Sequence, residues 1–257
     1  MTARLEPLPK LHGFALGLTD VGRMRQENQD AYFIDENLGV FAVMDGAGGM
    51  NDGARASRIV CESLSGITDP VSAKDLFDQF ESRVVWAKNE IEKAAERSEG
   101  VMMGTTIAAL LTYGAHFVCL WAGDSRVYRF REGRLEQLTT DHTEAQDLVD
   151  RKVLTAEEAK RYPRSHVITR AIGSGVDLEL DVVTGNLQPS DRFMLCSDGL
   201  TGHLDDAVIK SFLMNGAPQP TARGLINGAL DSGGSDNVTV VIVDIGFATK
   251  PQAETSQ

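Results

Sequence analysis

The sequence predicts an α+β fold in which a mostly antiparallel system of sheets is flanked by helices. Strand-like and helical segments are grouped along the 257 residues, whereas a doubly wound parallel sheet would alternate them. Several neighbouring strand-like runs are also separated by short turns, such as Glu132-Gly133, and short turns are typical of antiparallel hairpins.

The strands are predicted from short apolar runs bounded by turn residues. One long apolar stretch, from Thr105 to Gly123, is interrupted by Thr112-Tyr113-Gly114 and by His116, so two strands joined by a tight turn explain it better than a membrane span. The expected strands are 14–19, 31–35, 39–44, 105–112, 115–122, 126–131, 134–138, 178–184, 191–196 and 237–246.

The helices are predicted from apolar residues that recur on one face. Ser72 and Asp75 offer a capping box at the start of the longest helical segment, and Thr155 is the expected N-cap within a polar segment. The expected helices are 52–67, 73–97, 204–214 and 220–231, and the region 143–161 is expected to be polar and helical.

We expect residues 13–247 to form one domain, because no low-complexity linker divides the chain and its length allows a sizeable core. Residues 1–12 and the tail 248–257 have the composition of flexible ends.

The composition restricts the partner and the compartment. A net charge of −12 argues against nucleic acid or an anionic membrane as the partner, although an acidic surface also keeps many proteins soluble. The three cysteines lie inside apolar patterns and none is paired at metal-ligand spacing, which favours buried thiols in a reducing compartment. The first residues contain no apolar core of signal-peptide length, so we expect a cytoplasmic protein.

Four apolar runs meet an aspartate beside a glycine or in a glycine-rich turn, at Asp45, Asp124, Asp198 and Asp236. If strand ends bring such carboxylates together, each pair at ~4 Å repels by about 4 kcal/mol at an effective dielectric of ~20. Hard divalent cations remove that repulsion, because they prefer oxygen ligands. The pattern therefore indicates a metal enzyme built on strand ends.

Eight segments occur in a fixed order and spacing between Gly13 and Phe247, and together they resemble the metal-dependent protein phosphatase family of type 2C in its compact bacterial form. The segments are TDVGRMRQENQD (19–30), VMDGAGG (43–49), GTT (104–106), AGDSRVYRF (122–130), QLTTDH (137–142), TRAIGSG (169–175), LCSDGL (195–200) and SDNVTVVIV (235–243).

The resemblance implies a binuclear site for Mn²⁺ or Mg²⁺. Asp45 would bridge the two ions and Gly46 would offer its carbonyl oxygen. Asp198 and Asp236 would bind one ion directly, and Asp30 would reach the metals through water. Each aspartate also has a plain interpretation as a turn, cap or solvent-facing residue.

Asp124 matches the residue that holds a third, weaker ion in some bacterial members. A turn aspartate between two strands is an equal competitor for that position, so both interpretations stay open.

Arg25 matches the arginine that holds the substrate phosphate, since a guanidinium donates two parallel hydrogen bonds to phosphate oxygens. Arg23 is the local rival, and a solvated loop arginine is the plain alternative. Two positions depart from the family pattern: Ala47 stands where many members have a histidine that protonates the leaving oxygen, and Gln29 stands where glutamate is common.

The implied fold is an antiparallel β-sandwich of two sheets with helices on both outer faces, a four-layer α/β/β/α arrangement. Residues 143–168 resemble the family's mobile flap, although the polar, charged composition of Thr143 to His166 also fits a plain solvated helix pair. The implied reaction is hydrolysis of phosphoserine and phosphothreonine in proteins by a metal-bridging water, without a phosphoenzyme, because neither Cys196 nor Ser197 is expected to have a neighbouring base that activates it.

The expected partners are phosphoprotein products of a bacterial serine/threonine kinase, and we expect a monomer. The alternatives are a catalytically weak or inactive domain that binds phosphoproteins, and a structural metal-binding domain without catalysis.

Overall fold

The computed structural model describes residues 11–48, 52–98, 102–175, 177–214 and 216–247. Most of the two predicted flexible ends, 1–10 and 248–257, lies outside the described residues. The last two residues of the predicted N-terminal segment, Leu11 and His12, pair with Phe247 and Gly246 in a sheet.

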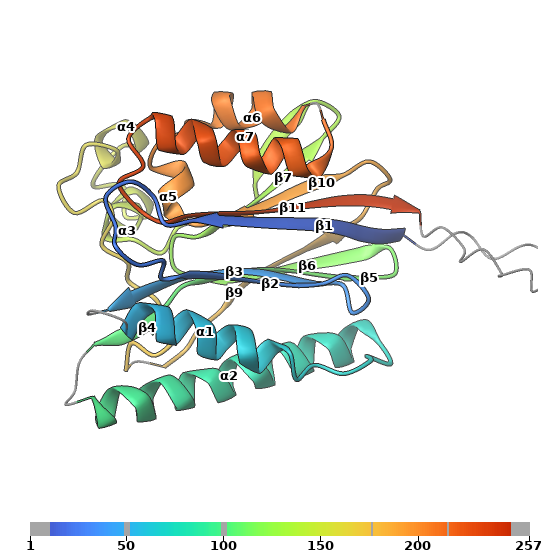
Figure 1. The fold of residues 1–257 in the computed structure, drawn as a ribbon, viewed down its shortest axis with the longest axis horizontal. Coiled ribbons are helices and arrows are strands. Elements are labelled where there is room, and N and C mark those ends of the chain that lie inside the picture. The colour runs from blue at the N-terminus through green and yellow to red at the C-terminus, as the bar shows by residue number, and fades with distance from the viewer. Residues whose placement is uncertain (1–10, 49–51, 99–101, 176, 215, 248–257) are drawn as a thin grey trace, which may run out of the picture.

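Two antiparallel sheets stack face to face, and they appear edge-on in Figure 1. The first has the order β1 (Leu11–Asp20), β11 (Val238–Phe247), β10 (Arg192–Cys196), β7 (Arg126–Arg131) and β8 (Arg134–Gln137). The second has the order β2 (Asp30–Asp35), β3 (Val40–Gly48), β5 (Ile107–Tyr113), β6 (His116–Ala122) and β9 (Asp181–Asn186), with β4 (Met103–Thr105) paired to the end of β3.

Helices cover the outer face of each sheet, as Figure 1 shows. The second sheet carries α1 (Asp52–Leu64) and α2 (Ala73–Arg97), and the first carries α6 (Asp206–Leu213) and α7 (Pro218–Asp231). Three short helices gather at one end of the sandwich: α3 (Glu144–Asp150), α4 (Ala156–Ala159) and α5 (Asp198–Thr201). The predicted four-layer arrangement is confirmed.

Each predicted strand overlaps an observed one, and the predicted hairpin at Glu132-Gly133 is confirmed. Both residues have positive φ, 49° and 76°, which is typical of the tight turn that matches strand twist. The predicted strand 178–184 is shifted, because β9 begins only at Asp181.

The predicted strand 105–112 is wrong in one respect, because it is split at Thr106. The Thr106 N–H donates to the Asp45 carbonyl (2.8 Å), and its Oγ1 accepts from the Asp45 N–H (3.0 Å). Thr106 therefore fixes the backbone of β3 at Asp45.

The region 143–161, predicted to be helical with an N-cap at Thr155, forms the two short helices α3 and α4. Lys152 adopts a left-handed conformation (φ 59°), which ends α3. A new helix then starts at Thr155, which forms the predicted N-cap and a reciprocal capping box with Glu158.

The capping box predicted at Ser72 is only half present. The Ser72 hydroxyl accepts from the Asp75 N–H (3.1 Å), but the Asp75 carboxylate accepts from Val71 (2.9 Å) rather than from Ser72.

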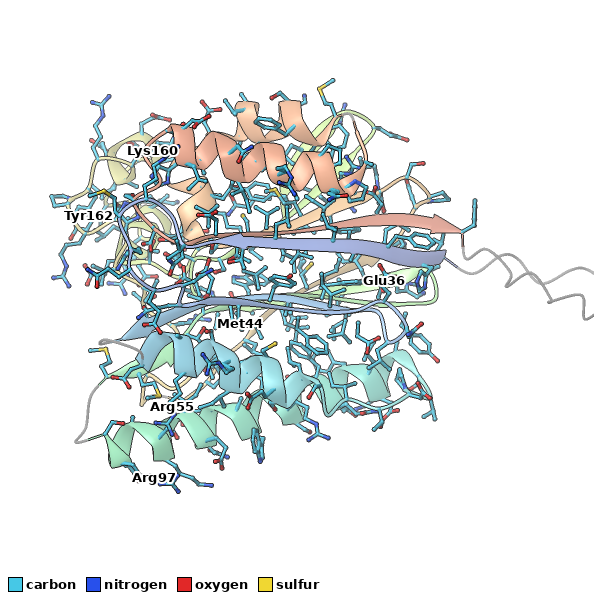
Figure 2. All side chains as sticks on the ribbon, viewed as in Figure 1. Glu36, Met44, Arg55, Arg97, Lys160 and Tyr162 are labelled. Carbon is cyan, nitrogen blue, oxygen red and sulfur yellow. The ribbon has the colours of Figure 1, made fainter. Side chains whose placement is uncertain are left out.

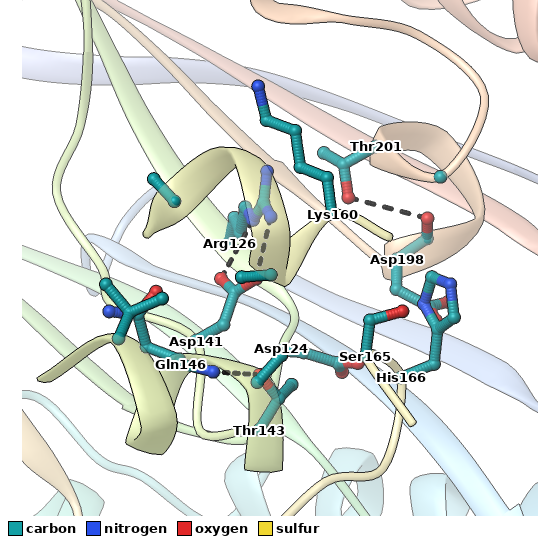
Figure 3. Close-up of a pocket in the computed structure, with 15 residues that line it drawn as sticks. Asp124, Arg126, Asp141, Thr143, Gln146, Lys160, Ser165, His166, Asp198 and Thr201 are labelled. Carbon is teal, nitrogen blue, oxygen red and sulfur yellow. Dashed lines mark hydrogen bonds and ion pairs between the residues drawn. The ribbon is translucent and has the colours of Figure 1, made fainter. Parts of the chain in front are cut away.

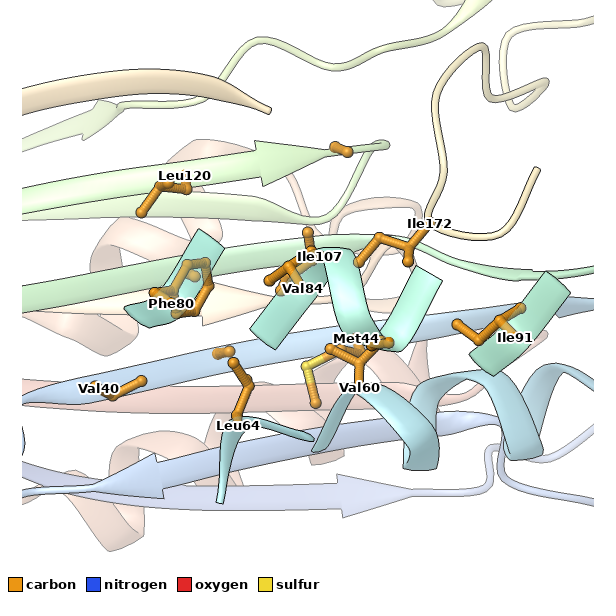
Figure 4. Packing of buried hydrophobic residues seen from close by; sticks show 14 of the residues in the cluster. Val40, Met44, Val60, Leu64, Phe80, Val84, Ile91, Ile107, Leu120 and Ile172 are labelled. Atoms are coloured by element: carbon orange, nitrogen blue, oxygen red, sulfur yellow. The ribbon is translucent and has the colours of Figure 1, made fainter. Parts of the chain in front are cut away.

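Alternation along β3 explains why this strand is rigid. Val40, Ala42 and Met44 pack toward α1 and α2, in the cluster drawn in Figure 4. Phe41 and Val43 point instead into the core between the two sheets. Since both faces of β3 are buried, the strand holds its last residues in a fixed place.

None of the helices that the structure describes is long and apolar enough to cross a membrane.

Candidate metal centre

Six of the seven predicted site residues line one pocket of about 280 Å³: Arg25, Asp45, Gly46, Asp124, Asp198 and Asp236. They come from the β1–β2 loop, the end of β3, the β6–β7 loop, the start of α5 and the residue pair before β11. The seventh, Asp30, is buried and sits directly opposite Asp45 in the β2–β3 pairing. Segments far apart in sequence thus converge at one end of the sandwich.

The backbone after Asp45, at the end of β3, packs closely against α1 and the β1–β2 loop, because the next residue is Gly46. The Gly46 N–H donates to the Gln29 carbonyl (3.2 Å), and a Cβ at Gly46 would collide with the carbonyl oxygen of Gly53 in the first turn of α1. Gly46 is thus the residue that lets α1 approach the site.

Asp236 is positioned through its neighbour Asn237, which the sequence argument did not single out. The Asn237 amide donates to the carbonyls of Val21 (2.8 Å) and Glu27 (2.9 Å), and its Oδ1 accepts from the Gln29 N–H (2.8 Å). Three bonds therefore attach the loop that carries Arg25 to the start of β11.

Asp30 has one satisfied and one orphaned oxygen. Its Oδ2 accepts from the hydroxyls of Ser197 (2.7 Å) and Thr239 (2.6 Å). Its Oδ1 is buried without a hydrogen-bond partner among the residues that the structure describes. Burial raises the pKa of Asp30 to about 7, these two hydroxyls oppose the rise, and the charges of Asp198 and Asp236 add to it.

Burial and repulsion between negative charges also raise the pKa values of Asp45 and Asp124. Burial raises the pKa of Asp45 well above its usual range, and the charges of Asp30, Asp198 and Asp124 raise it further. Burial and the charge of Asp198 do the same at Asp124. These shifts mark carboxylates that lack a compensating positive charge, and a divalent cation would supply one.

The donor set fits cations that keep part of their water. Among the described parts of the chain, no three His, Cys, Asp or Glu side chains are close enough together to hold one ion by themselves. Mg²⁺ and related hard cations use one or two carboxylates and several waters, which the orphaned Asp30 oxygen could also bind. The residues present therefore fit hydrated cations that share aspartates.

Arg25 and its rival Arg23 have different partners. Arg23 donates to the Leu230 carbonyl (2.7 Å) and pairs with Asp231 (3.2 Å), away from the pocket. Arg25 lines the pocket and donates to Asp236 (2.7 Å), and this bond raises the pKa of its guanidinium. Of the two arginines, Arg25 is the one that lines the pocket.

A family model described as protein phosphatase 2C matches residues 23–226. The chain belongs to the protein phosphatase 2C family.

Two curated phosphatase 2C relatives are similar over most of this chain. The serine/threonine protein phosphatase PstP of Mycobacterium tuberculosis is 35% identical over 228 residues, which cover 88% of this chain and 44% of that protein. The chain thus spans less than half the length of that relative. The serine/threonine phosphatase stp of Listeria welshimeri is 31% identical over 238 residues, which cover 88% of this chain and 93% of that protein.

A solved phosphatase 2C structure has the same fold. It is the catalytic domain of serine threonine protein phosphatase PstP in complex with 2 manganese ions. Its TM-score is 0.83 at 33% identity, over 92% of this chain and 99% of that one. The family and the two-sheet sandwich predicted from the sequence are confirmed.

The two departures from the phosphatase 2C pattern both lie in the pocket, where Ala47 and Gln29 form part of the wall. Ala47 offers no proton to a leaving group. A histidine to which the sequence assigned no role, His166, lines the same pocket. No ligand spacing marks it in the sequence, so only the fold reveals its position.

The predicted flap lies beside the site. A second cavity of about 480 Å³ adjoins the pocket, lies under α3 and α4, and shares Asp124, Asp198 and His166 with it (Figure 3). On its wall Arg126 makes a bidentate pair with Asp141 (2.8 and 2.7 Å).

The expectation that Ser197 has no neighbouring base is wrong, because its hydroxyl donates to Asp30. Ser197 is nevertheless fully buried, so a substrate cannot reach it. Cys196 is also fully buried, and burial raises the pKa of its thiol to about 12. Neither side chain is placed to act as a nucleophile.

Proposed function

We propose that this chain is a metal-dependent serine/threonine protein phosphatase that hydrolyses phosphoserine and phosphothreonine in proteins. The observation that supports it most is the convergence of Asp45, Asp124, Asp198 and Asp236 with Arg25 in one pocket. The names of the relatives, which are serine/threonine phosphatases, agree with this function.

Asp45 with the Gly46 carbonyl, Asp198 and Asp236 would hold two Mn²⁺ or Mg²⁺ ions, with Asp30 acting through water. Asp124 would hold a third, weaker ion. When bound, the ions supply the Lewis acidity that activates water near neutral pH.

The protein's own groups would position the substrate. Arg25 would bind the phosphate oxygens through its planar guanidinium. It can exchange its present partner for phosphate, because the side chains of Arg25 and Asp236 are 54% and 34% exposed. Thr106 holds the backbone of Asp45 in place, and the Asn237 N–H donates to the Asp236 carboxylate (2.8 Å). Because no acid stands at Ala47, the leaving oxygen must take its proton from water or from another group in the pocket.

Residues 13–247 would form one catalytic domain, with residues 143–168 as a flap that contacts the protein substrate. We further propose that the substrates are products of a bacterial serine/threonine kinase, and that the enzyme acts as a monomer in the cytoplasm. A weak or inactive phosphoprotein-binding domain is the second candidate, since Ala47 removes one acid. The presence of every expected metal aspartate favours catalysis.

The test measures phosphate release from a phosphothreonine peptide. We expect release with Mn²⁺, none after chelation, and a large loss in Asp45→Asn and in Asp198→Asn. Asp231→Asn is the matched control, because Asp231 is exposed and pairs with Arg23 on the surface, outside the pocket. Activity that survives chelation or both site substitutions would refute the proposal.

A further inference from the structure

Helices α1 and α2 enclose another recessed surface, the α1–α2 groove, with a volume of about 370 Å³. Arg55, Arg58 and Ile59 line it from α1, and Trp86, Ala94 and Arg97 line it from α2. None of these residues belongs to the metal pocket.

The α1–α2 groove has an arginine cluster that its surroundings do not neutralise. Arg55, Arg58 and Arg97 are all exposed, and none has an ion pair within the described ranges of the chain. Other arginines of this protein are paired, for example Arg126 with Asp141 and Arg192 with Asp244. In a chain of net charge −12, three free guanidinium groups side by side are a local exception.

Two carboxylates also line the groove, but they do not cancel the cluster. Glu90 already accepts from Lys93 (2.8 Å). Glu62 lies one helical turn beyond Arg58, farther from the start of α1. The positive end of the groove is therefore the end where α1 begins and α2 finishes. Figure 2 labels Arg55 and Arg97 on these two helices.

Trp86 supplies an apolar anchor at a fixed distance from the cluster. Its side chain is 49% exposed, and it also lines an adjoining hollow with Gln79 and Arg83. It lies eleven positions before Arg97 in α2, or about 16 Å at ~1.5 Å per residue. An extended peptide covers that length in about five residues.

The groove starts next to the proposed catalytic site. Asp52, the first residue of α1, follows β3 closely in sequence, and Gly53 contacts Gly46 in the pocket wall. Arg55 lies in that same first turn of α1. A chain bound in the groove can therefore belong to a protein that also presents a residue to the pocket.

We propose that the α1–α2 groove is a docking surface for an acidic segment of a protein partner. Carboxylates of the segment contact Arg55, Arg58 and Arg97, and an apolar residue about five positions away packs on Trp86. Charge complementarity selects the partner, because the rest of this acidic protein repels such a segment. That the partner is a phosphoprotein substrate rests on the proposed function, whereas the docking itself does not.

Binding is tested first, with an unphosphorylated fluorescein-labelled peptide in which a run of Asp and Glu lies about five residues from a leucine. Fluorescence anisotropy is measured in chelator, so that the metal pocket takes no part. We expect binding that weakens as ionic strength rises toward about 0.15 M. We expect Arg58→Ala/Arg97→Ala to weaken it by about tenfold, and Trp86→Ala by several-fold.

The matched control is Arg134→Ala/Arg223→Ala, which removes two exposed arginines on β8 and α7, and it should bind like the unmodified protein. No binding by the unmodified protein, or equal binding by both double variants, would overturn the proposal. A second result would also overturn the proposal: the unmodified protein binds phosphatidylserine vesicles but not the peptide, and Arg58→Ala/Arg97→Ala abolishes the vesicle binding. The groove would then be assigned to a membrane surface.

Catalysis is tested second, with Mn²⁺ and two phosphothreonine peptides that differ only in the acidic segment. We expect Arg58→Ala/Arg97→Ala to lower kcat/KM by about tenfold for the acidic peptide only, with p-nitrophenyl phosphate unaffected. If the unmodified protein hydrolyses neither peptide, the proposed function fails while the binding result stands. If the unmodified protein hydrolyses both phosphopeptides but the labelled acidic peptide shows no anisotropy change, the docking proposal fails while the proposed function stands.

Discussion

Asn237 offers the sharpest test of how the fold positions the substrate arginine. Its side chain makes three hydrogen bonds to the backbone of the loop that carries Arg25, at Val21, Glu27 and Gln29. Asn237→Ala removes all three. A net contribution of about 0.5–1.5 kcal/mol for each bond gives an expected loss of roughly 2–4 kcal/mol in the free energy of unfolding.

The loss should appear in urea unfolding as a lower midpoint at an unchanged slope. Because the loop would be freed, KM for a phosphothreonine peptide should also rise. Asn89→Ala, at an exposed position of α2, is the control and should change neither quantity. A loss below about 0.5 kcal/mol with an unchanged KM would refute the reasoning, because the loop would then hold its place without Asn237.

Three further predictions concern buried or pocket groups. Ser197→Ala should lower the free energy of unfolding by about 1–3 kcal/mol, because Asp30 loses a hydrogen-bond donor. The variant should keep most of its phosphatase activity. Abolished turnover in a folded variant would make Ser197 a nucleophile after all. In chelator, the free energy of unfolding should rise as pH falls from 8 to 6, since the folded-state pKa of Asp30 is raised to about 7 and protonation removes a buried charge. Asp30→Asn should flatten this pH dependence in urea unfolding. An equal slope of stability against pH in both proteins would contradict the prediction. His166→Gln should lower kcat for a phosphothreonine peptide by on the order of 10²-fold but leave kcat for p-nitrophenyl phosphate nearly unchanged, because only the peptide's leaving group needs a proton. Equal losses of kcat on both substrates would exclude His166 as the proton donor.

The layers and the convergence of the carboxylates could be predicted from the sequence because both follow from local patterns. Apolar runs define the strands, and Asp45 and Asp198 stand where such runs stop. The order of the eight segments then identifies which strand ends meet. A resemblance of this kind transfers positions, and Arg25, which it selects over Arg23, lies in the pocket.

The supporting contacts could not be predicted, because they depend on which way a side chain turns in three dimensions. Thr106 reads as one more strand residue, yet it leaves the strand to bond Asp45. Asn237 has the sequence context of a turn residue, and His166 lies in a segment whose polar composition is typical of a solvated helix pair. Ser197 gained an acceptor, Asp30, from a strand 167 positions away in sequence.

The central claim is that aspartates from four separate elements hold a pair of ions, and a manganese-soaked crystal measured at the manganese absorption edge tests it directly. We expect two anomalous peaks about 3.5–4 Å apart in the pocket, both in contact with Asp45, and their joint loss in Asp45→Asn. Peaks outside this pocket, or none between Asp45 and Asp198, would contradict the account.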